Sequence, residues 1–364
     1  MHAIENTQES IEEFFRNTVQ KDRKIHNAYL LVHSDKLGIH LNMAEGSTNN
    51  IPANENQPYY IASVGKLFTS VLVGILVEQG KLSYDYTIIP YLEKDLLQDL
   101  HVVKGKDCTN QIRIRHLLNH TSGIHDYFGD KPRYAKAMLE QIVGEPYRFW
   151  RPQEVIQWSK ENLNSHFPPG KGFHYSDTGY HILGLIIEKT TSMPFHAALK
   201  QYIFQPLEMN HSYLAQHSEP LVQSDYPVAD IYIGATRINV SQHRSLSIDY
   251  AGGGIVSTSD DLLKFMKALV KHVIISESTL EKMKDWARFV FGIDYGYGIM
   301  NIKTIPLFMP KKLNSWGNAG STGSFLFYHP KMDAYLIGSL NYQGYHAKGI
   351  RMMLKIVNIL LKCD

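Results

Sequence analysis

Cysteine is scarce in this chain. Its 364 residues include two cysteines, Cys108 and Cys363, which lie far apart in the sequence. A framework of disulfide bonds is therefore not expected, and the composition is compatible with a reducing compartment. We expect both residues to be free thiols.

Long apolar runs and a strong charge imbalance are also missing. No segment approaches the roughly 18 consecutive apolar residues of a membrane span. The first ten residues are polar and acidic, unlike a secretory signal, which starts with basic residues and continues with an apolar stretch. The formal net charge is +2, and no run of lysine and arginine alternates with aromatic residues, so nucleic acid is not an expected partner. We expect a cytoplasmic protein, or a periplasmic or extracellular one if a leader has been removed.

Several familiar catalytic and metal-binding motifs are absent. The chain has no Gly-x-Ser-x-Gly elbow, and no Gly-Lys pair is followed by serine or threonine, which disfavours an α/β-hydrolase fold and excludes a phosphate-binding loop. His116 and His120 have the i, i+4 spacing of zinc ligands, and His125 follows closely, but no acidic residue completes a His-Glu-x-x-His pattern. We expect these histidines to be structural and predict no metal.

One serine is distinguished by its spacing to a lysine. Ser63 is the only serine followed three residues later by a lysine, Lys66, and the pair opens a long apolar segment at 67–77. On a helix, positions i and i+3 share a face, so the amine can reach the serine hydroxyl. A serine needs such a base to attack a carbonyl, and the first turn of a helix offers free N–H groups to an oxyanion. A surface lysine beside a helix N-terminus would give the same pattern, so other segments must decide.

The apolar pattern along the chain predicts an α/β fold with a helical interruption. Helical periodicity covers 9–22, and two strand-like segments around a short turn predict a β-hairpin. Strand composition returns near the C-terminus, and a capping cluster at 257–261 begins a helix that continues to Leu269. The segments are a hairpin at 27–33 and 37–43, helices at 154–162 and 181–191, strands at 298–302, 323–328 and 334–340, and a terminal helix at 350–361. We therefore expect residues 1–84 and 236–364 to form an α/β sheet region, residues 85–235 to form a mainly helical insertion, and a cleft to lie between the two.

Two further segments carry residues suited to a cleft. A turn rich in proline and glycine at 168–172 leads into Tyr175-Ser176-Asp177 just before a helical stretch, so a phenol and a carboxylate can be presented together. In the second segment, 316–328, small residues continue into a strand. A backbone with small side chains lets a ligand approach closely.

Three motifs follow one another in a recognisable order: Ser63-x-x-Lys66, Tyr175-x-Asp177 and Asn318-x-Gly320. Their order and rough spacing resemble the Ser-x-x-Lys, Tyr-x-Asn and Lys- or His-x-Gly motifs of class C serine β-lactamases, D-alanyl-D-alanine carboxypeptidases and related esterases and D-amino-acid amidases. Segments 115–123 and 252–258 are also similar to stretches common in that family. The resemblance covers most of the chain between residues 25 and 345. It implies a β-lactamase-like fold, in which helices flank an antiparallel sheet and a mainly helical subdomain is inserted.

The resemblance implies a serine hydrolase that works through an acyl-enzyme. Ser63 would attack the substrate, Lys66 and Tyr175 would share the proton transfers, and the backbone N–H groups of Ser63 and Ser321 would form the oxyanion hole. Losing one such donor costs about 3 kcal/mol in comparable sites. The expected partner is a small ester or amide substrate, and neither a metal nor an organic cofactor is implied.

Two positions depart from the family pattern. Asp177 stands where the family usually has asparagine, and Asn318 stands where it has lysine or histidine. A carboxylate near Lys66 favours the charged ammonium, which is a poorer base and shifts the task toward Tyr175. The missing cation removes an attraction for the carboxylate that β-lactams and cell-wall stem peptides carry. We therefore expect an esterase or an amidase or peptidase for neutral or amine-bearing substrates, with weak or no β-lactamase activity.

The remaining site residues are assigned to substrate binding. These are Asp177, Asn318, Gly320, Trp316 and Tyr127, although aromatic residues near a strand more often belong to the core. Tyr175 itself could be a core tyrosine. The departures also leave an alternative, a penicillin-binding or sensory homologue without turnover, whose acylated serine is long-lived. The intact serine, lysine and tyrosine favour the enzyme.

Overall fold

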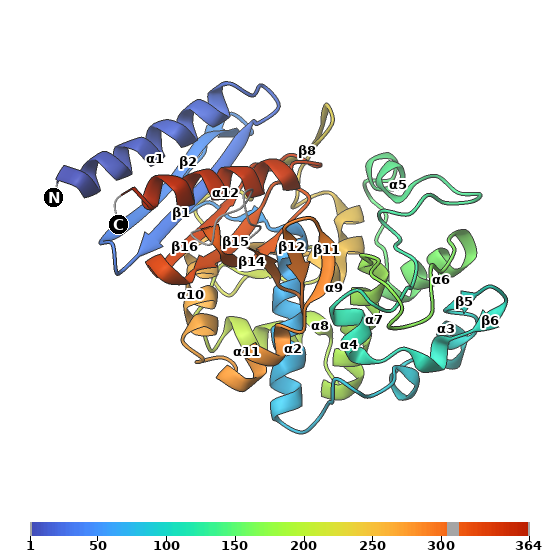
Figure 1. Cartoon of the computed structure of the whole chain (residues 1–364). Coiled ribbons are helices and arrows are strands. Elements are labelled where there is room, and N and C mark those ends of the chain that lie inside the picture. Colours follow the sequence, from blue (N-terminus) through green and yellow to red (C-terminus); the bar gives the residue numbers. More distant parts are fainter. Residues whose placement is uncertain (1, 304–312, 363–364) are drawn as a thin grey trace.

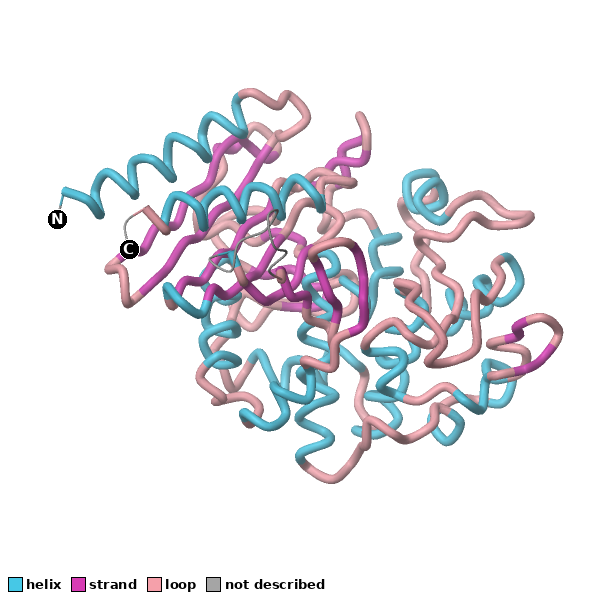
Figure 2. Tube along the Cα trace, viewed as in Figure 1, coloured by secondary structure: helices cyan, strands magenta, loops and turns pink. Residues whose placement is uncertain are grey.

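A nine-stranded antiparallel sheet forms the centre of the computed structural model, which describes residues 2–303 and 313–362 (Figure 1; Figure 2). Strand β1 pairs with β16, so the start of the chain extends a sheet built by its end. The predicted hairpin and the three predicted C-terminal strands are confirmed. In spatial order the strands are β11 (Ala287–Val290), β12 (Ile293–Tyr295), β13 (Met300–Ile302), β14 (Ser315–Ala319), β15 (Phe325–His329), β16 (Ala334–Ser339), β1 (Asn27–Ser34), β2 (Ile39–Thr48) and β3 (Ile51–Pro52).

Both faces of the sheet are buried at its centre. Every residue of β1 is buried. Alternate side chains of a strand point to opposite faces, and β1 follows this rule: Tyr29 and Leu31 join one hydrophobic cluster, whereas Leu30 and its even-numbered neighbours join another. A strand buried on both faces needs helices on each side, because a single layer would leave one apolar face in water.

Helices α1 (His2–Gln20) and α12 (His346–Leu360) cover one face, and they run side by side in Figure 1. Ile11 and Phe15 of α1 share a hydrophobic cluster with Met353 and Ile356 of α12 and with the sheet. Each helix therefore buries one apolar stripe, as the periodicity predicted.

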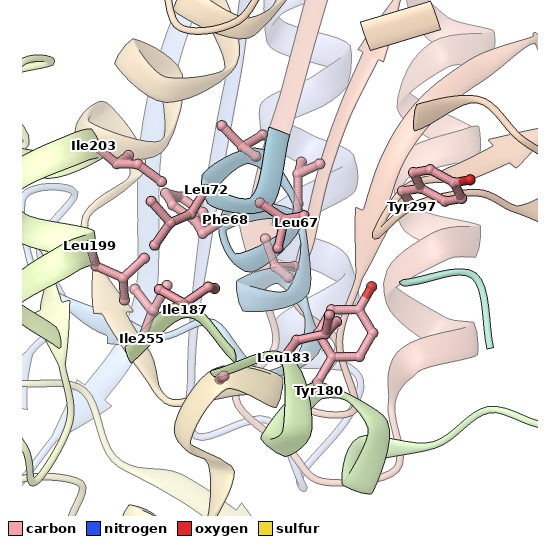
Figure 3. Close-up of a cluster of buried hydrophobic side chains, with 14 of the residues drawn as sticks. Leu67, Phe68, Leu72, Tyr180, Leu183, Ile187, Leu199, Ile203, Ile255 and Tyr297 are labelled. Atoms are coloured by element: carbon pink, nitrogen blue, oxygen red, sulfur yellow. The ribbon is translucent and has the colours of Figure 1, made fainter. Parts of the chain in front are cut away.

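Helix α2 (Gly65–Glu78) lies on the opposite side of the sheet and forms the centre of the larger core. Figure 3 shows Leu67, Phe68 and Leu72 of this helix among side chains from several other elements. The ring of Phe68 stacks on Phe265 with centroids 3.8 Å apart. Because α2 is largely apolar, its first twelve residues are buried. The turn Ala62–Val64, which leads into α2, is therefore anchored to the core.

The other elements surround this core. The middle of the chain contributes α3 (Lys94–Leu97), α4 (Ile114–Leu118), α5 (Met138–Gly144), α6 (Pro152–Asn162), α7 (Asp177–Thr191) and α8 (Phe195–Leu199), and α9 (Tyr250–Gly253), α10 (Ser259–Val270) and α11 (Glu277–Met283) follow. Small sheets join β4 (Tyr59–Tyr60), β10 (Ile255–Ser257) and β7 (Tyr213–Leu214), β5 (Val102–Val103) with β6 (Lys106–Asp107), and β8 (Ile231–Ile233) with β9 (Thr236–Ile238). The helix-rich middle agrees with the sequence pattern, while the boundaries at 84 and 236 stay a prediction.

Capping explains where two helices begin. Helix α7 starts at Asp177, four residues before the predicted start, because the Ser176 side chain accepts a hydrogen bond from the Gly179 N–H at 3.1 Å. The predicted cap of α10 is confirmed, since Thr258 accepts a hydrogen bond from the Asp261 N–H.

Two sequence expectations concern cysteine and membranes. Cys108 is a buried free thiol, and Cys363 lies outside the described residues. Among the helices in residues 2–303 and 313–362, none combines the length and apolar character that a bilayer crossing requires.

Shortening Phe68 tests the central role of α2. We expect Phe68→Ala to lower the free energy of unfolding by about 3–5 kcal/mol, because it opens a cavity between α2 and α10. Tyr147, which is 80% exposed, provides the control. Tyr147→Ala should change the free energy of unfolding by less than about 0.5 kcal/mol. Urea unfolding followed by circular dichroism measures both. Equal effects for the two variants would contradict this account of the core.

Candidate active site

Ser63 is the one accessible residue in a buried stretch. All residues from Gln57 to Leu76 except Ser63 are buried. Ser63 lies in a short 3₁₀ turn, Ala62–Val64, directly before α2. Ala62 has a φ of 47°, in the left-handed region that non-glycine residues rarely adopt. Such backbone strain persists only where the surroundings impose it, and it often marks a functional position.

Two glycines hold this turn by close backbone approach. A Cβ atom on Gly253 would lie 2.9 Å from the Ala62 carbonyl carbon, and one on Gly320 would lie 2.9 Å from the Ala62 Cβ. Both distances are too short for real side chains. The turn before α2 is therefore held between α9 and the loop after β14, and glycine is required at both positions.

Lys66 lies one turn further along α2, and its side chain is fully buried. Its Nζ donates to the Ser63 Oγ at 3.3 Å and to the Gly252 carbonyl at 2.6 Å, and it forms an ion pair with Asp177. The i, i+3 spacing therefore brings the lysine to the serine, as the sequence indicated. A buried ammonium without such partners would cost several kcal/mol.

Tyr175 completes the predicted group of three side chains. It lines the same cleft as Ser63, and its ring lies 5.0 Å from the Lys66 Nζ. Burial, reinforced by the negative charge of Asp177, raises the pKa of Tyr175 well above its ordinary value, although the interaction with Ser63 opposes this. The phenol is therefore neutral at physiological pH and can donate a proton.

His120 holds the ring of Tyr175. The two ring centroids are 4.2 Å apart, and the His120 Nδ1 accepts a hydrogen bond from the Ser176 N–H at 3.1 Å. Burial lowers the pKa of His120 well below its ordinary value, and the charge of Lys66 adds to the effect. The residue is therefore a neutral packing partner, which agrees with its expected structural role.

Three carboxylates gather beside the serine. Asp126 and Asp249 join Asp177 in the wall of the cleft, and the Asp126 side chain accepts a hydrogen bond from the Asp177 N–H at 2.9 Å. Burial and the charge of Asp177 raise the pKa of Asp126 to about 7. Burial also raises the pKa of Asp249 to about 6, although the hydrogen bond from Tyr60 opposes the increase. Sequence reasoning missed Asp126 and Asp249, since neither belongs to a motif.

The cleft has a volume of about 570 Å³, and Ser63 is one of the residues that line it. Apolar side chains of the β11 to β13 region and of α12 form much of the rest of its wall, with His346 and Arg351 also contributed by α12. A second hollow of about 610 Å³, lined mostly by residues between 211 and 228, contains none of Ser63, Lys66 and Tyr175. The first cleft is therefore the candidate site.

The predicted oxyanion and binding residues fall into two groups. Gly320 and Ser321 lie in the loop after β14 and line the cleft together with Ser63. Trp316, Asn318 and Tyr127 are buried and are not among the residues that line it.

The side chains of Asn318 and Tyr127 form hydrogen bonds with other parts of the chain and do not face the cleft. The Asn318 amide donates to the Gly298 carbonyl at 2.8 Å. The Tyr127 hydroxyl donates to the Ile248 carbonyl at 3.2 Å and lies 3.4 Å from an Asp249 oxygen. In this conformation both side chains support the wall from behind.

The antiparallel sheet with helices on both faces and the Ser63 cleft between the elements define the β-lactamase-like fold class. The chain belongs to the Beta-lactamase family, which matches residues 15–356.

Comparisons with known proteins support this family assignment. A penicillin-binding protein of Bacillus subtilis (strain 168) is 29% identical over 266 residues, covering 69% of this chain and 54% of that relative. This chain thus spans about half of that relative's length. The solved structure of a D-stereospecific amidohydrolase from Streptomyces sp. has a TM-score of 0.77 and 23% identity, covering 96% of this chain and 98% of the other. An octameric penicillin-binding protein homologue from Pyrococcus abyssi has a TM-score of 0.76 and 26% identity, covering 97% of this chain and 77% of the other.

The raised pKa of Asp249 predicts a pH dependence of stability. Folding raises this pKa from 3.8 to about 6, so the folded protein binds more protons than the unfolded chain between about pH 4 and 6. The contribution of Asp249 to stability is therefore complete at low pH and is lost as the pH rises through this window, by up to about 3 kcal/mol.

Asp249→Asn should remove this part of the pH dependence, because an amide does not titrate. Urea unfolding at pH 4, 5, 6 and 7 measures the slope. The exposed Asp225 provides the control, and Asp225→Asn should retain the wild-type slope. If Asp249→Asn retains it as well, the assignment to Asp249 is wrong.

Proposed function

We propose that this protein is a serine hydrolase that forms an acyl-enzyme on Ser63. The observation that carries the proposal is the position of this hydroxyl, which is accessible from the cleft, 3.3 Å from the Lys66 Nζ and in the same cleft wall as Tyr175. A nucleophile within reach of a base, which is itself oriented by a third group, is the usual arrangement for covalent catalysis. Membership of the Beta-lactamase family supports the same reaction.

The ion pair between Lys66 and Asp177 suggests how the base is generated. The ammonium must lose a proton before it can accept one from Ser63, and Asp177 is the adjacent acceptor. Transfer along this pair leaves a neutral amine beside the serine hydroxyl. As Ser63 attacks the carbonyl carbon, its proton passes to Lys66.

Tyr175 is suited to act as the acid in the next step. Its raised pKa holds the phenol protonated, so it can donate a proton to the leaving group and recover one from Lys66. The net result is that the serine proton leaves with the alcohol or amine product. Water then attacks the acyl-enzyme by the reverse route.

The expected oxyanion hole fits the same cleft. Ser63 and Ser321 line it from two different elements, so their backbone N–H groups are candidates to bind the carbonyl oxygen as it becomes negative. Backbone donors of this kind make the contribution independent of the Ser321 side chain.

The carboxylates beside Ser63 favour a substrate with a positive charge near the scissile bond. Asp126, Asp177 and Asp249 line the cleft, and the Lys66 ammonium beside them is already paired. An ester or amide with a free amine would gain from this field, whereas a carboxylate close to the scissile bond would be repelled. The fold shared with a D-stereospecific amidohydrolase is consistent with the hydrolysis of an amide. Weak or no β-lactamase activity follows from the same argument.

The ion pair also supports a second candidate function. A lysine held as an ammonium is a poor base for deacylation, so the acyl-enzyme could be long-lived, as in a penicillin-binding or sensory protein. A burst of one acyl group per chain without further turnover would favour this function.

The nucleophile can be tested by covalent labelling. We expect one fluorophosphonate adduct per wild-type chain in intact-protein mass spectrometry, and none in Ser63→Ala. Turnover of p-nitrophenyl acetate and butyrate should fall by about 10⁴-fold or more in the same variant. The exposed Ser278 provides a control, so Ser278→Ala should label and turn over as wild type. Labelling that persists in Ser63→Ala would place the nucleophile elsewhere.

The substrate charge can be tested with paired substrates. We expect kcat/KM for D- or L-phenylalanine p-nitroanilide to exceed that for its N-acetylated form by at least tenfold, about 1.4 kcal/mol of transition-state stabilisation. Asp177→Asn should reduce this preference, because one negative charge is removed, whereas Asp225→Asn should not. A preference unchanged by Asp177→Asn would overturn the proposed amine recognition while leaving the serine mechanism intact.

A further inference from the structure

Asp130, His166 and His174 form a cluster outside the cleft. The His166 Nε2 lies 2.9 Å from one carboxylate oxygen of Asp130, and the His174 Nε2 lies 3.1 Å from the other. The two imidazole rings are stacked, with centroids 3.5 Å apart. One ligand-type atom from each residue lies within 4.8 Å of the other two. Three side chains from two loops, one that carries Asp130 and one that carries His166 and His174, thus direct metal-ligating atoms toward one point.

We propose that these three residues form a binding site for a divalent transition metal of the zinc class. Two imidazole nitrogens and one carboxylate oxygen are ligands that zinc prefers, and three protein ligands leave a fourth position for water. Two ligand atoms about 2.1 Å from a tetrahedral zinc lie about 3.4 Å apart. The nitrogen–oxygen separations in the cluster need to widen only slightly to reach this geometry.

The backbone holds the ligands in place. The His166 N–H donates to the Gly123 carbonyl at 2.8 Å, and the His174 N–H donates to the His120 carbonyl at 2.9 Å. The Asp130 carboxylate accepts a hydrogen bond from the Asp126 N–H at 2.8 Å. All three ligands are therefore held against the segment between residues 120 and 126, and little rearrangement is needed for binding.

A dication satisfies this cluster better than two protonated histidines would. Two positive rings stacked at 3.5 Å repel each other, and a single carboxylate offsets one charge. A dication held between the three side chains would join both imidazoles to the carboxylate.

The site would position Tyr175 without taking part in the reaction. His174 directly precedes Tyr175, and none of the three ligands lines the cleft. A metal would join the loop that carries His166, His174 and Tyr175 to the Asp130 turn. The proposal is independent of the proposed hydrolase function, because it rests on these three side chains alone.

Zinc titration of chelator-stripped protein, in competition with a chromogenic zinc indicator, tests the site directly. We expect one zinc per wild-type chain, bound with micromolar or tighter affinity. His166→Ala and His174→Ala should each weaken binding at least tenfold, since even the loss of an outer partner of a metal ligand typically costs about 10- to 100-fold. His272 is exposed at a φ of 56°, which asparagine tolerates, so His272→Asn is the matched control and should bind zinc as wild type. Equal affinity in all variants, or no saturable binding by wild type, would overturn the proposal.

Two further measurements keep the test decisive if an alanine variant misfolds. Cobalt(II) added to wild-type protein should give visible absorption bands typical of four-coordinate nitrogen and oxygen ligation, and their absence would refute the site. Zinc should raise the Tm of wild type but leave that of the near-isosteric Asp130→Asn unchanged. An equal rise in both would show that zinc binds elsewhere.

Discussion

The arrangement of the cleft depends on burying the charged amine of Lys66. A fully buried ammonium is tolerated only when hydrogen bonds and an opposite charge compensate for lost hydration. Asp177 at the start of α7 and the Gly252 carbonyl of α9 provide that compensation. Three helices that are distant in the sequence therefore converge on one nitrogen atom, and this convergence places Ser63 at the base of the cleft.

Close packing around Ser63 has a second consequence, which concerns charge. Bringing α7 and α9 against α2 also brings Asp126 and Asp249 near Asp177 in the wall of the cleft. Burial raises the pKa values of Asp126 and Asp249, and the negative charge of Asp177 adds to the increase. The same packing that compensates the lysine thus creates a negative wall and keeps Tyr175 protonated. The proposed base, the proposed acid and the proposed substrate preference all follow from this one buried arrangement.

Much of the fold could be predicted because its signals are local. The hairpin at β1 and β2, the amphipathic α1 and the cap of α10 each depend on neighbours within a few residues. Predicted boundaries were less accurate where a cap lies outside the apolar pattern, as at the start of α7. The sequence predicted that both ends of the chain contribute to one sheet region, but the pairing of β1 with β16 came only from the tertiary structure, since no local pattern joins the two ends of a chain.

The site shows the limit of the sequence most clearly. The sequence by itself determined the Ser63 and Lys66 pair, because residues three positions apart on a helix share one face whatever surrounds them. Only the tertiary structure decided that Asn318 turns toward Gly298, that Asp126 and Asp249 join the cleft wall, and that His166 and His174 meet at Asp130. Such meetings arise from the packing of distant segments, where burial and electrostatics act through space, and residue spacing does not encode them.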